Sequence, residues 1–138
     1  MRGHGMKSHW KIALFTCMVL MLSPGCKKLE GEFGFKAPFD DVYKKIAGVP
    51  EFREGDKREW TFVFKEFTGT RDIGVFIMKK ELVWVEVTHF MEKVRQEDRV
   101  IRGTIEDLRE GRYKITIVHK SDLVAEKEFL VYSDEESQ

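Results

Sequence analysis

Hydrophobic and polar residues alternate at every second position in much of the second half of the chain. Three aromatic side chains occupy positions 60, 62 and 64, and the positions after them hold Thr61, Val63 and Lys65. A period of two places successive side chains on opposite faces of an extended chain, as in a strand that buries one face. The pattern therefore predicts a β-strand over residues 60–65.

Several more short strands follow. Residues 72–78 are apolar at nearly every position, which predicts a strand covered on both faces, and residues 79–81 then form a turn. In residues 82–88 one face carries Val83, Val85 and Val87, and the other carries Leu82, Trp84 and Glu86. Residues 94–97 are expected as a charged edge strand or a loop, and strands are expected at 99–105, 113–117 and 123–132. Six to seven short strands at this spacing are typical of a small β-sandwich, so the fold class is all-β.

The segment before these strands has no clear period. Residues 27–38 are expected to form a tether whose phenylalanines cover an edge or end of the domain. Asp40 is a candidate N-cap, Val42 and Ile46 are spaced by four, and Gly48 is a candidate stop, so a short helix is expected over 40–47. The expected organisation is a signal peptide at 1–25, a tether at 26–57, a sandwich domain at 58–133 and an acidic tail at 134–138.

The N-terminal residues predict export. A basic stretch at 7–11 precedes an apolar run at 12–22, and the small residues Ser23 and Gly25 follow. This order is that of a secretory signal peptide. An apolar run of this length is too short for a bilayer core, which needs about 20 residues in a helix. Met6 is an alternative start, because the signal is complete from that residue.

Cys26 directly follows this segment, and Gly25-Cys26 resembles the lipobox of bacterial lipoprotein signals. Leu22 stands one place earlier than in the family, and Pro24 occupies the position before Gly25. The resemblance implies that Cys26 is lipidated and becomes the new N-terminus, so the chain is anchored to a membrane. Lys27 follows where an inner-membrane protein of this family carries Asp, which implies the outer membrane if the organism has one. The alternative is ordinary cleavage after Gly25, which leaves a free thiol.

Length, charge and cysteine content narrow the functional classes. The chain has 138 residues, 42% hydrophobic and 35% charged, which suits one folded domain. The three charged residues before Cys26 are all basic, and without them 21 basic residues face 24 acidic ones, a net charge of −3. Nucleic acid is therefore not expected as a partner, because phosphate binding requires concentrated positive charge. Cys17 lies in the leader, so Cys26 has no partner for a disulfide.

A second resemblance concerns the fold. The pattern Leu108-x-x-Gly111-x-Tyr113 resembles the tyrosine corner of immunoglobulin-like and fibronectin type III-like sandwiches. In those domains a tyrosine at the start of the penultimate strand bonds to the backbone upstream. The resemblance implies an immunoglobulin-like β-sandwich, and that fold hosts many unrelated functions. The alternative is that Tyr113 is simply a core aromatic residue at a strand start.

Motifs for catalysis or metal binding are not found in the sequence. His89 and His119 are far apart and have no cysteine or paired carboxylate at metal-ligand spacing. No catalytic residue, metal site or cofactor is therefore expected. Carboxylates are numerous, so a small hydrolase that uses a carboxylate pair stays as an alternative. The candidates for such a pair are Glu86, Glu97, Asp98 and Glu106.

Trp84, Phe76 and Phe90 form the candidate binding face, on the side of the strand opposite the valines. Exposed aromatic side chains on a sheet can stack on sugars or anchor a protein partner. The alternative is that they pack against the second sheet or the 33–46 segment. The sequence thus predicts a non-enzymatic envelope lipoprotein that contacts another envelope protein through a sheet edge or the Trp84 face. A carbohydrate-binding module that uses Trp60 or Trp84 is the second hypothesis.

Overall fold

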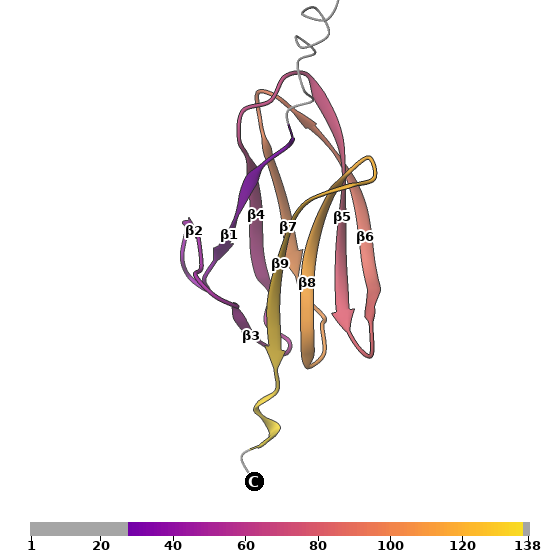
Figure 1. Cartoon of the computed structure of the whole chain (residues 1–138). Coiled ribbons are helices and arrows are strands. Elements are labelled where there is room, and N and C mark those ends of the chain that lie inside the picture. Colours follow the sequence, from indigo (N-terminus) through magenta and orange to yellow (C-terminus); the bar gives the residue numbers. More distant parts are fainter. Residues whose placement is uncertain (1–27, 137–138) are drawn as a thin grey trace, which may run out of the picture.

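The computed structural model describes residues 28–136, which form an all-β domain of two sheets packed face to face (Figure 1). Within these residues there is no α-helix, and a single 3-10 turn at Asp134–Glu136 follows the last strand. The strands are β1 (Gly31–Lys36), β2 (Tyr43–Lys44), β3 (Glu51–Arg53), β4 (Arg58–Phe64), β5 (Thr70–Lys80), β6 (Trp84–Arg95), β7 (Val100–Ile105), β8 (Gly111–His119) and β9 (Asp122–Tyr132).

The two sheets have four and five strands. The first has the order β2-β1-β4-β7, and all its neighbours are antiparallel. The second has the order β3-β9-β8-β5-β6, in which only β3 and β9 run parallel. The chain therefore passes between the sheets several times, as expected for a sandwich. β6 is one of the two edge strands of the larger sheet, and it is also the longest strand described.

Side chains from the inner faces of both sheets form the core. The first sheet contributes Trp60, Phe62 and Ile101, and the second contributes Ile73, Ile115, Ile117 and Phe129, each at most 1% exposed. Burying an aliphatic or aromatic side chain of this kind stabilises the fold by about 1.5–3 kcal/mol. The all-β prediction is confirmed, and so is the alternation predicted over 113–117. Trp60, Phe62 and Phe64 are buried as predicted, but Thr61 between them is buried as well.

The N-terminal part of the domain differs from the expectation of a tether. β1 pairs along its whole length with β4, from Gly31 opposite Phe64 to Lys36 opposite Glu59. Its aromatic residues join the core, where Phe35 packs against Phe52 of β3 with ring centroids 5.7 Å apart. The sandwich therefore includes strands that precede residue 58. The apolar period-two pattern in Phe33 and Phe35 was too short to reveal this strand.

The short helix expected over residues 40–47 is not formed. Asp40 does cap a turn, because its carboxylate accepts a hydrogen bond from the Val42 amide at 3.2 Å. The chain then extends as β2, which pairs with β1. The Lys127 ammonium donates to the carbonyls of Ile46 and Gly48 at 3.1 and 2.6 Å. These contacts to β1 and β9 outweigh the weak helical signal of a segment that has only two apolar residues at helical spacing.

Two strand ends also differ from the sequence prediction. β5 continues through Lys80, so the turn lies at residues 81–83 rather than 79–81. β6 continues to Arg95, so Val94 belongs to the strand, where it is buried. The predicted signal peptide at 1–25 and the candidate lipidation residue Cys26 lie outside the described residues.

Candidate functional site

The free edge of β6 is the most extensive unpaired strand edge in the described chain. β6 pairs with β5 on one side, from Trp84 opposite Lys80 to Arg95 opposite Thr70. No described strand lies on its other side, and Figure 1 shows β6 at the outer margin of the sheet. In an antiparallel strand about every second residue directs its N–H and C=O away from the neighbour. A row of backbone donors and acceptors is therefore available for another strand.

The β5–β6 pairing contains a β-bulge. Thr88 lies opposite Ile77, but the next pair joins Glu86 to Met78, so Val87 is an extra residue on β6. The side chains before the bulge thus change face relative to a regular alternation. Bulges of this kind are common in edge strands, where they increase local twist.

Exposed apolar side chains gather where β6 begins, and we call Leu82, Val83, Val85 and Val87 the hairpin strip. Their exposed fractions are 98%, 66%, 45% and 46%. Val94 at the other end of β6 is only 2% exposed, since it joins the core. β7, the neighbouring edge of the first sheet, is half as long as β6, so it covers only part of the strand. The apolar strip is therefore left in solvent.

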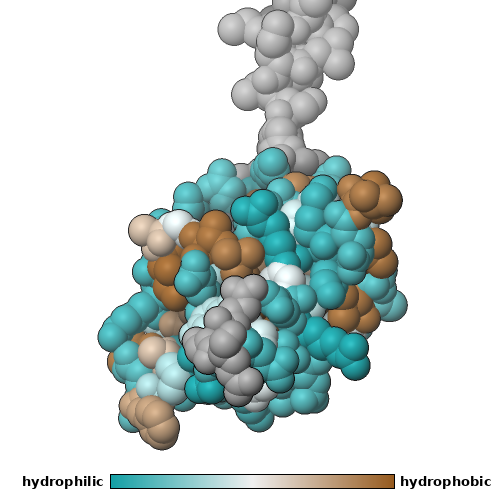
Figure 2. All heavy atoms as spheres, turned by 90° about the horizontal axis from the view of Figure 1, so that it is seen from below, coloured by the Kyte–Doolittle hydropathy of each residue, from teal (hydrophilic) through white to brown (hydrophobic). Residues whose placement is uncertain are grey.

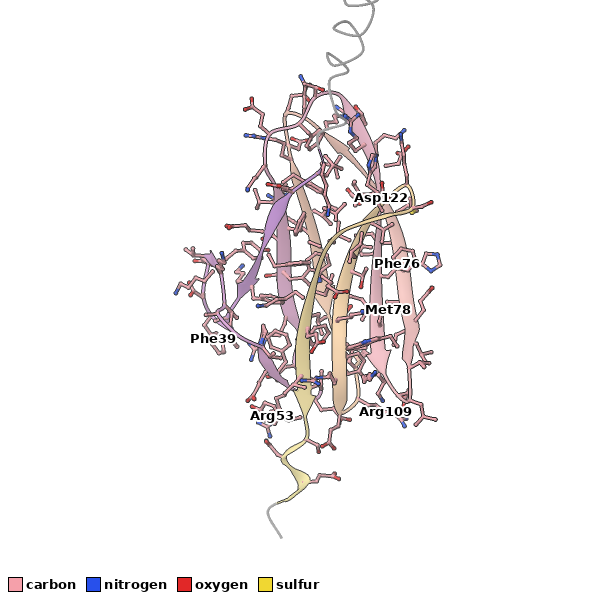
Figure 3. All side chains as sticks on the ribbon, in the orientation of Figure 1. Phe39, Arg53, Phe76, Met78, Arg109 and Asp122 are labelled. Carbon is pink, nitrogen blue, oxygen red and sulfur yellow. The ribbon has the colours of Figure 1, made fainter. Side chains whose placement is uncertain are left out.

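The three aromatic residues of the candidate binding face do not all lie together. Phe76 and Trp84 are on the outer face of the larger sheet, and Met78, two positions after Phe76, shares that face (Figure 3). Phe90 lies opposite the buried Val75 and packs against the core from the inner face. The structure therefore separates Phe90 from the other two. Sequence alone suggested otherwise because the bulge at Val87 is invisible in the pattern.

Polar side chains contact the rings of both Trp84 and Phe76 on the outer face of the larger sheet. The Lys114 and Lys80 ammonium groups lie 4.5 and 5.5 Å from the centroid of the half-buried Trp84 ring. Phe76 stacks on the His89 imidazole, with centroids 5.6 Å apart and an angle of 26°. A ring already covered by a cation offers less of its face to a sugar, although it can still contribute to a protein interface.

Trp60, the other tryptophan considered for glycan binding, is in the core. It is 1% exposed, and its indole lies beside Gly103 of β7. Its Nε1 has no hydrogen-bond partner among the described residues. In this position Trp60 cannot act as a stacking platform for a ligand in solvent.

A broad open groove of about 1210 Å³ lies at the end of the sandwich where β5 begins and β8 turns into β9. Its apolar lining includes Phe76, Met91 and Val118, and its polar lining includes both acidic and basic residues. Burial lowers the pKa of His119 at this groove, and the charges of Lys120 and Arg71 lower it further. The mixed charge of the lining favours no single ligand class.

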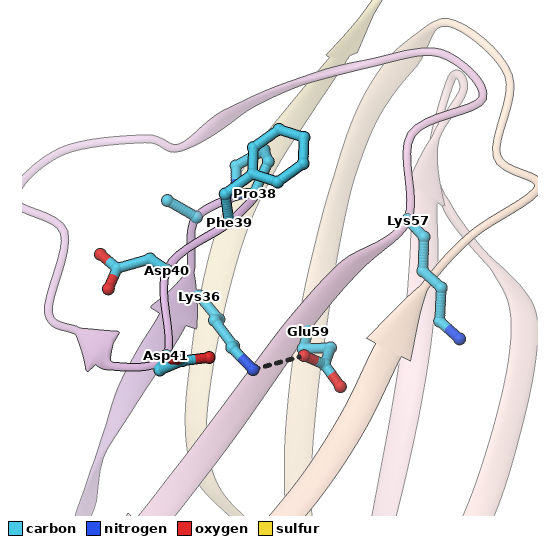
Figure 4. A pocket seen from close by; sticks show the side chains of 8 residues that line it. Lys36, Pro38, Phe39, Asp40, Asp41, Lys57 and Glu59 are labelled. Atoms are coloured by element: carbon cyan, nitrogen blue, oxygen red, sulfur yellow. Dashed lines mark ion pairs between the residues drawn. The ribbon is translucent and has the colours of Figure 1, made fainter.

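A smaller hollow of about 430 Å³ lies between the turn after β1 and the start of β4 (Figure 4). Lys36 and Glu59 form an ion pair across it at 3.2 Å, and their hydrogen bond raises the pKa of Lys36. Phe39 at its rim is fully exposed. The side chains of Lys36 and Glu59 are thus engaged with each other, and Asp40, Asp41 and Lys57 also line the hollow.

Tyr113, which the sequence predicts as the residue of a tyrosine corner, makes a hydrogen bond to the backbone upstream, as that prediction requires. The Tyr113 hydroxyl donates to the carbonyl of Arg109 at 2.7 Å. Leu108 packs against the core, and Gly111 adopts a φ of 155° at the start of β8. A Cβ at residue 111 would lie 2.8 Å from Cε of Lys79. These three residues therefore fix the entry of the chain into β8.

Neither a scan against models of known families nor a search of curated proteins finds a match to the chain. In residues 28–136 no helix has the length and hydrophobicity to cross a bilayer. The same residues contain no group of three or more histidine, cysteine or acidic side chains that could hold a metal ion. The candidate site, which is the free edge of β6 with the hairpin strip, is therefore assigned from its geometry alone.

The hairpin strip and the free edge were only partly foreseeable from sequence. The row Val83, Val85 and Val87 is visible as one face of a strand, but such a row normally faces a core. Sequence does not show that β6 is an edge strand, or that β7 is too short to cover it.

Seen from the C-terminal end, most of the surface is hydrophilic and hydrophobic atoms form separate patches near its margin (Figure 2).

Proposed function

We propose that this chain is an exported, membrane-anchored and non-enzymatic binding module that engages a protein partner through the free edge of β6. The single observation that carries the proposal is the unpaired β6 edge bordered by the exposed hairpin strip. Strand addition to such an edge is a recurring mode of recognition, in which backbone hydrogen bonds give affinity and side-chain contacts give specificity.

The cellular setting of the proposal rests on the N-terminal residues. The signal-peptide pattern favours export, and the lipobox resemblance at Cys26 favours a lipid anchor on the cell envelope, at the outer membrane if there is one. A lipid-anchored domain is confined to a surface, which raises its effective concentration toward neighbours on that surface. A modest edge interface is then sufficient for function.

We also infer an immunoglobulin-like type of sandwich. The row β6-β5-β8-β9 follows the chain order of strands C′, C, F and G, and the row β1-β4-β7 follows that of A, B and E. The bond from Tyr113 to Arg109 supports the same assignment. In this assignment β6 corresponds to strand C′ and is an edge strand of the larger sheet.

Site-specific photocrosslinking tests the proposed function. A photoreactive amino acid replaces Val83 of the hairpin strip in the full chain, which is expressed in its native cells and irradiated. The matched control places the same group at Val63, which is 51% exposed but lies on β4 of the other sheet. We expect a discrete protein adduct at position 83 and none at position 63. No adduct at 83, or equal adducts at both positions, would refute the proposal.

A further inference from the structure

We propose that the partner at the β6 edge is a second copy of this chain, paired antiparallel about a twofold axis through Phe90. This inference rests on the proposed function, because it assigns the occupant of the same edge. A twofold interface requires the strand to be complementary to itself. The distribution of side chains along β6 meets that requirement.

The bulge makes the two ends of β6 compatible. Opposed residues of paired strands must lie on the same face of the sheet. Glu86 and Lys93 are an odd number of residues apart, so in a regular strand they would lie on opposite faces. Because Val87 is an extra residue, Glu86 lies opposite Met78 and Lys93 opposite Asp72. Met78 and Asp72 share one face of the regular strand β5, so Glu86 and Lys93 share it too.

With the axis at Phe90, each residue of β6 meets a residue of its own face. Moving away from the axis, each residue before Phe90 in one copy lies opposite the corresponding residue after Phe90 in the other copy. Val87 is left out of this register in both copies, because it is the extra residue of the bulge. The opposed pairs are then His89 with Met91, Thr88 with Glu92, Glu86 with Lys93, Val85 with Val94, and Trp84 with Arg95. Each of these pairs occurs twice, and the two Phe90 residues oppose each other.

The chemistry of the opposed pairs is favourable at both ends of the strand. Glu86 and Lys93 carry opposite charges, and such cross-strand pairs stabilise a sheet. Val85 and Val94 are both apolar, and an apolar pair directly opposed on one face also stabilises a sheet. The N-terminal half of β6 is thus complementary to its C-terminal half.

The same charges disfavour other alignments of two β6 strands. A parallel alignment with equal residues opposed would place Glu86 beside Glu86 and Lys93 beside Lys93, and like charges directly opposite are destabilising. Charged residues on edge strands commonly suppress unspecific pairing in this way. The charge pattern of β6 therefore favours the antiparallel alignment over the parallel one with equal residues opposed.

Charge reversal at the opposed pair tests the inference. The full chain is studied by sedimentation in detergent micelles that are in large molar excess over protein. The variants are Glu86→Lys, Lys93→Glu and the double variant, with circular dichroism to show that each is folded. Glu128→Lys on β9 serves as the control, because it makes the same reversal on the same sheet away from the β6 edge.

We expect a dimer for the wild type and a dissociation constant at least about tenfold higher for each single variant, because each dimer then contains two like-charge pairs. The double variant should regain the wild-type dissociation constant, and a mixture of the two single variants should form a heterodimer. The control should dimerise like the wild type.

Other outcomes would overturn the inference. A wild type that stays monomeric at a protein concentration of about 200 µM would contradict a stable β6 interface between two copies. Single variants that dimerise like the wild type, or a mixture that forms no heterodimer, would exclude this register. A monomeric chain that still crosslinks another protein from position 83 would remove the second copy and leave the proposed function standing.

Discussion

The indole of Trp60 lies against Gly103, which is its direct neighbour across the β4–β7 ladder. A Cβ at residue 103 would be placed 2.7 Å from Nε1 of the indole, well inside contact distance. The ring occupies the space that any other residue would need for its side chain. Gly103 is thus required by the packing of the largest core residue.

We therefore expect Gly103→Ala to lower the free energy of unfolding by about 1–3 kcal/mol, the usual cost of overpacking a core. In a Trp60→Phe background the same substitution should cost less, because the smaller ring leaves room for the methyl group. Urea unfolding of the four proteins in this cycle measures both effects. Equal costs in the two backgrounds would show that the indole does not restrict residue 103.

The corner at β8 gives a second prediction. Tyr113→Phe removes the hydroxyl that donates to the Arg109 carbonyl and should lower the free energy of unfolding by about 0.5–1.5 kcal/mol. Tyr132→Phe is the matched control, because Tyr132 is exposed at the end of β9 and should change stability by less than about 0.5 kcal/mol. Denaturant unfolding compares them, and equal effects would argue against a structural bond at Tyr113.

The pH dependence of stability gives a third prediction. The pKa of His119 is below its ordinary 6.5, chiefly because burial disfavours the charged ring. The unfolded chain then binds a proton more readily than the folded one. His119 therefore costs no stability above pH 6.5, and it lowers stability progressively as the pH falls through the lower folded pKa.

Replacing His119 by Gln should remove this dependence. The free energy of unfolding of the wild type should decrease between pH 7.5 and pH 5 by more than that of His119→Gln. NMR titration of the ring should also show a pKa below 6.5, which rises in Lys120→Met because a repelling charge is lost. A ring that titrates at or above 6.5 would contradict the environment described for His119.

Anchoring gives a fourth prediction. If Cys26 is acylated, the protein extracted from membranes should have the mass of a chain that begins at Cys26 plus its acyl groups. Cys26→Ala should shift the protein to the soluble fraction, since one apolar leader of this length does not span a bilayer. An unmodified protein that retains residues 1–25 would contradict both export processing and lipidation.

Local patterns in the sequence predicted the all-β class because strand periodicity is a property of neighbouring residues. The alternation at Trp60, Phe62 and Phe64 gave β4 directly, and the spacing around Tyr113 gave the corner. β1 and β3 were not predicted because their segments become strands only by pairing with distant parts of the chain. The length of β7 and the bulge at Val87 are likewise decided by tertiary pairing.

In the candidate binding surface, too, some features follow from local sequence patterns and others only from tertiary pairing. Trp84 and Phe76 were placed on one face correctly, but Phe90 was not, because one extra residue reverses the face of everything beyond it. The sequence pattern shows that Val83, Val85 and Val87 form a row, but it does not show that this row is exposed to solvent. Whether a strand is an edge depends on the order of strands in the sheet, which no local pattern contains.

The most direct test of pairing between two copies at the β6 edge is amide hydrogen exchange of the full chain at low and high protein concentration. β7, the edge strand of the other sheet, is the internal reference. The account predicts that exchange in β6 slows as the concentration rises, because outward amides become hydrogen-bonded, while exchange in β7 does not change. Exchange in β6 that is independent of concentration, or slowing that is equal in both strands, would contradict it.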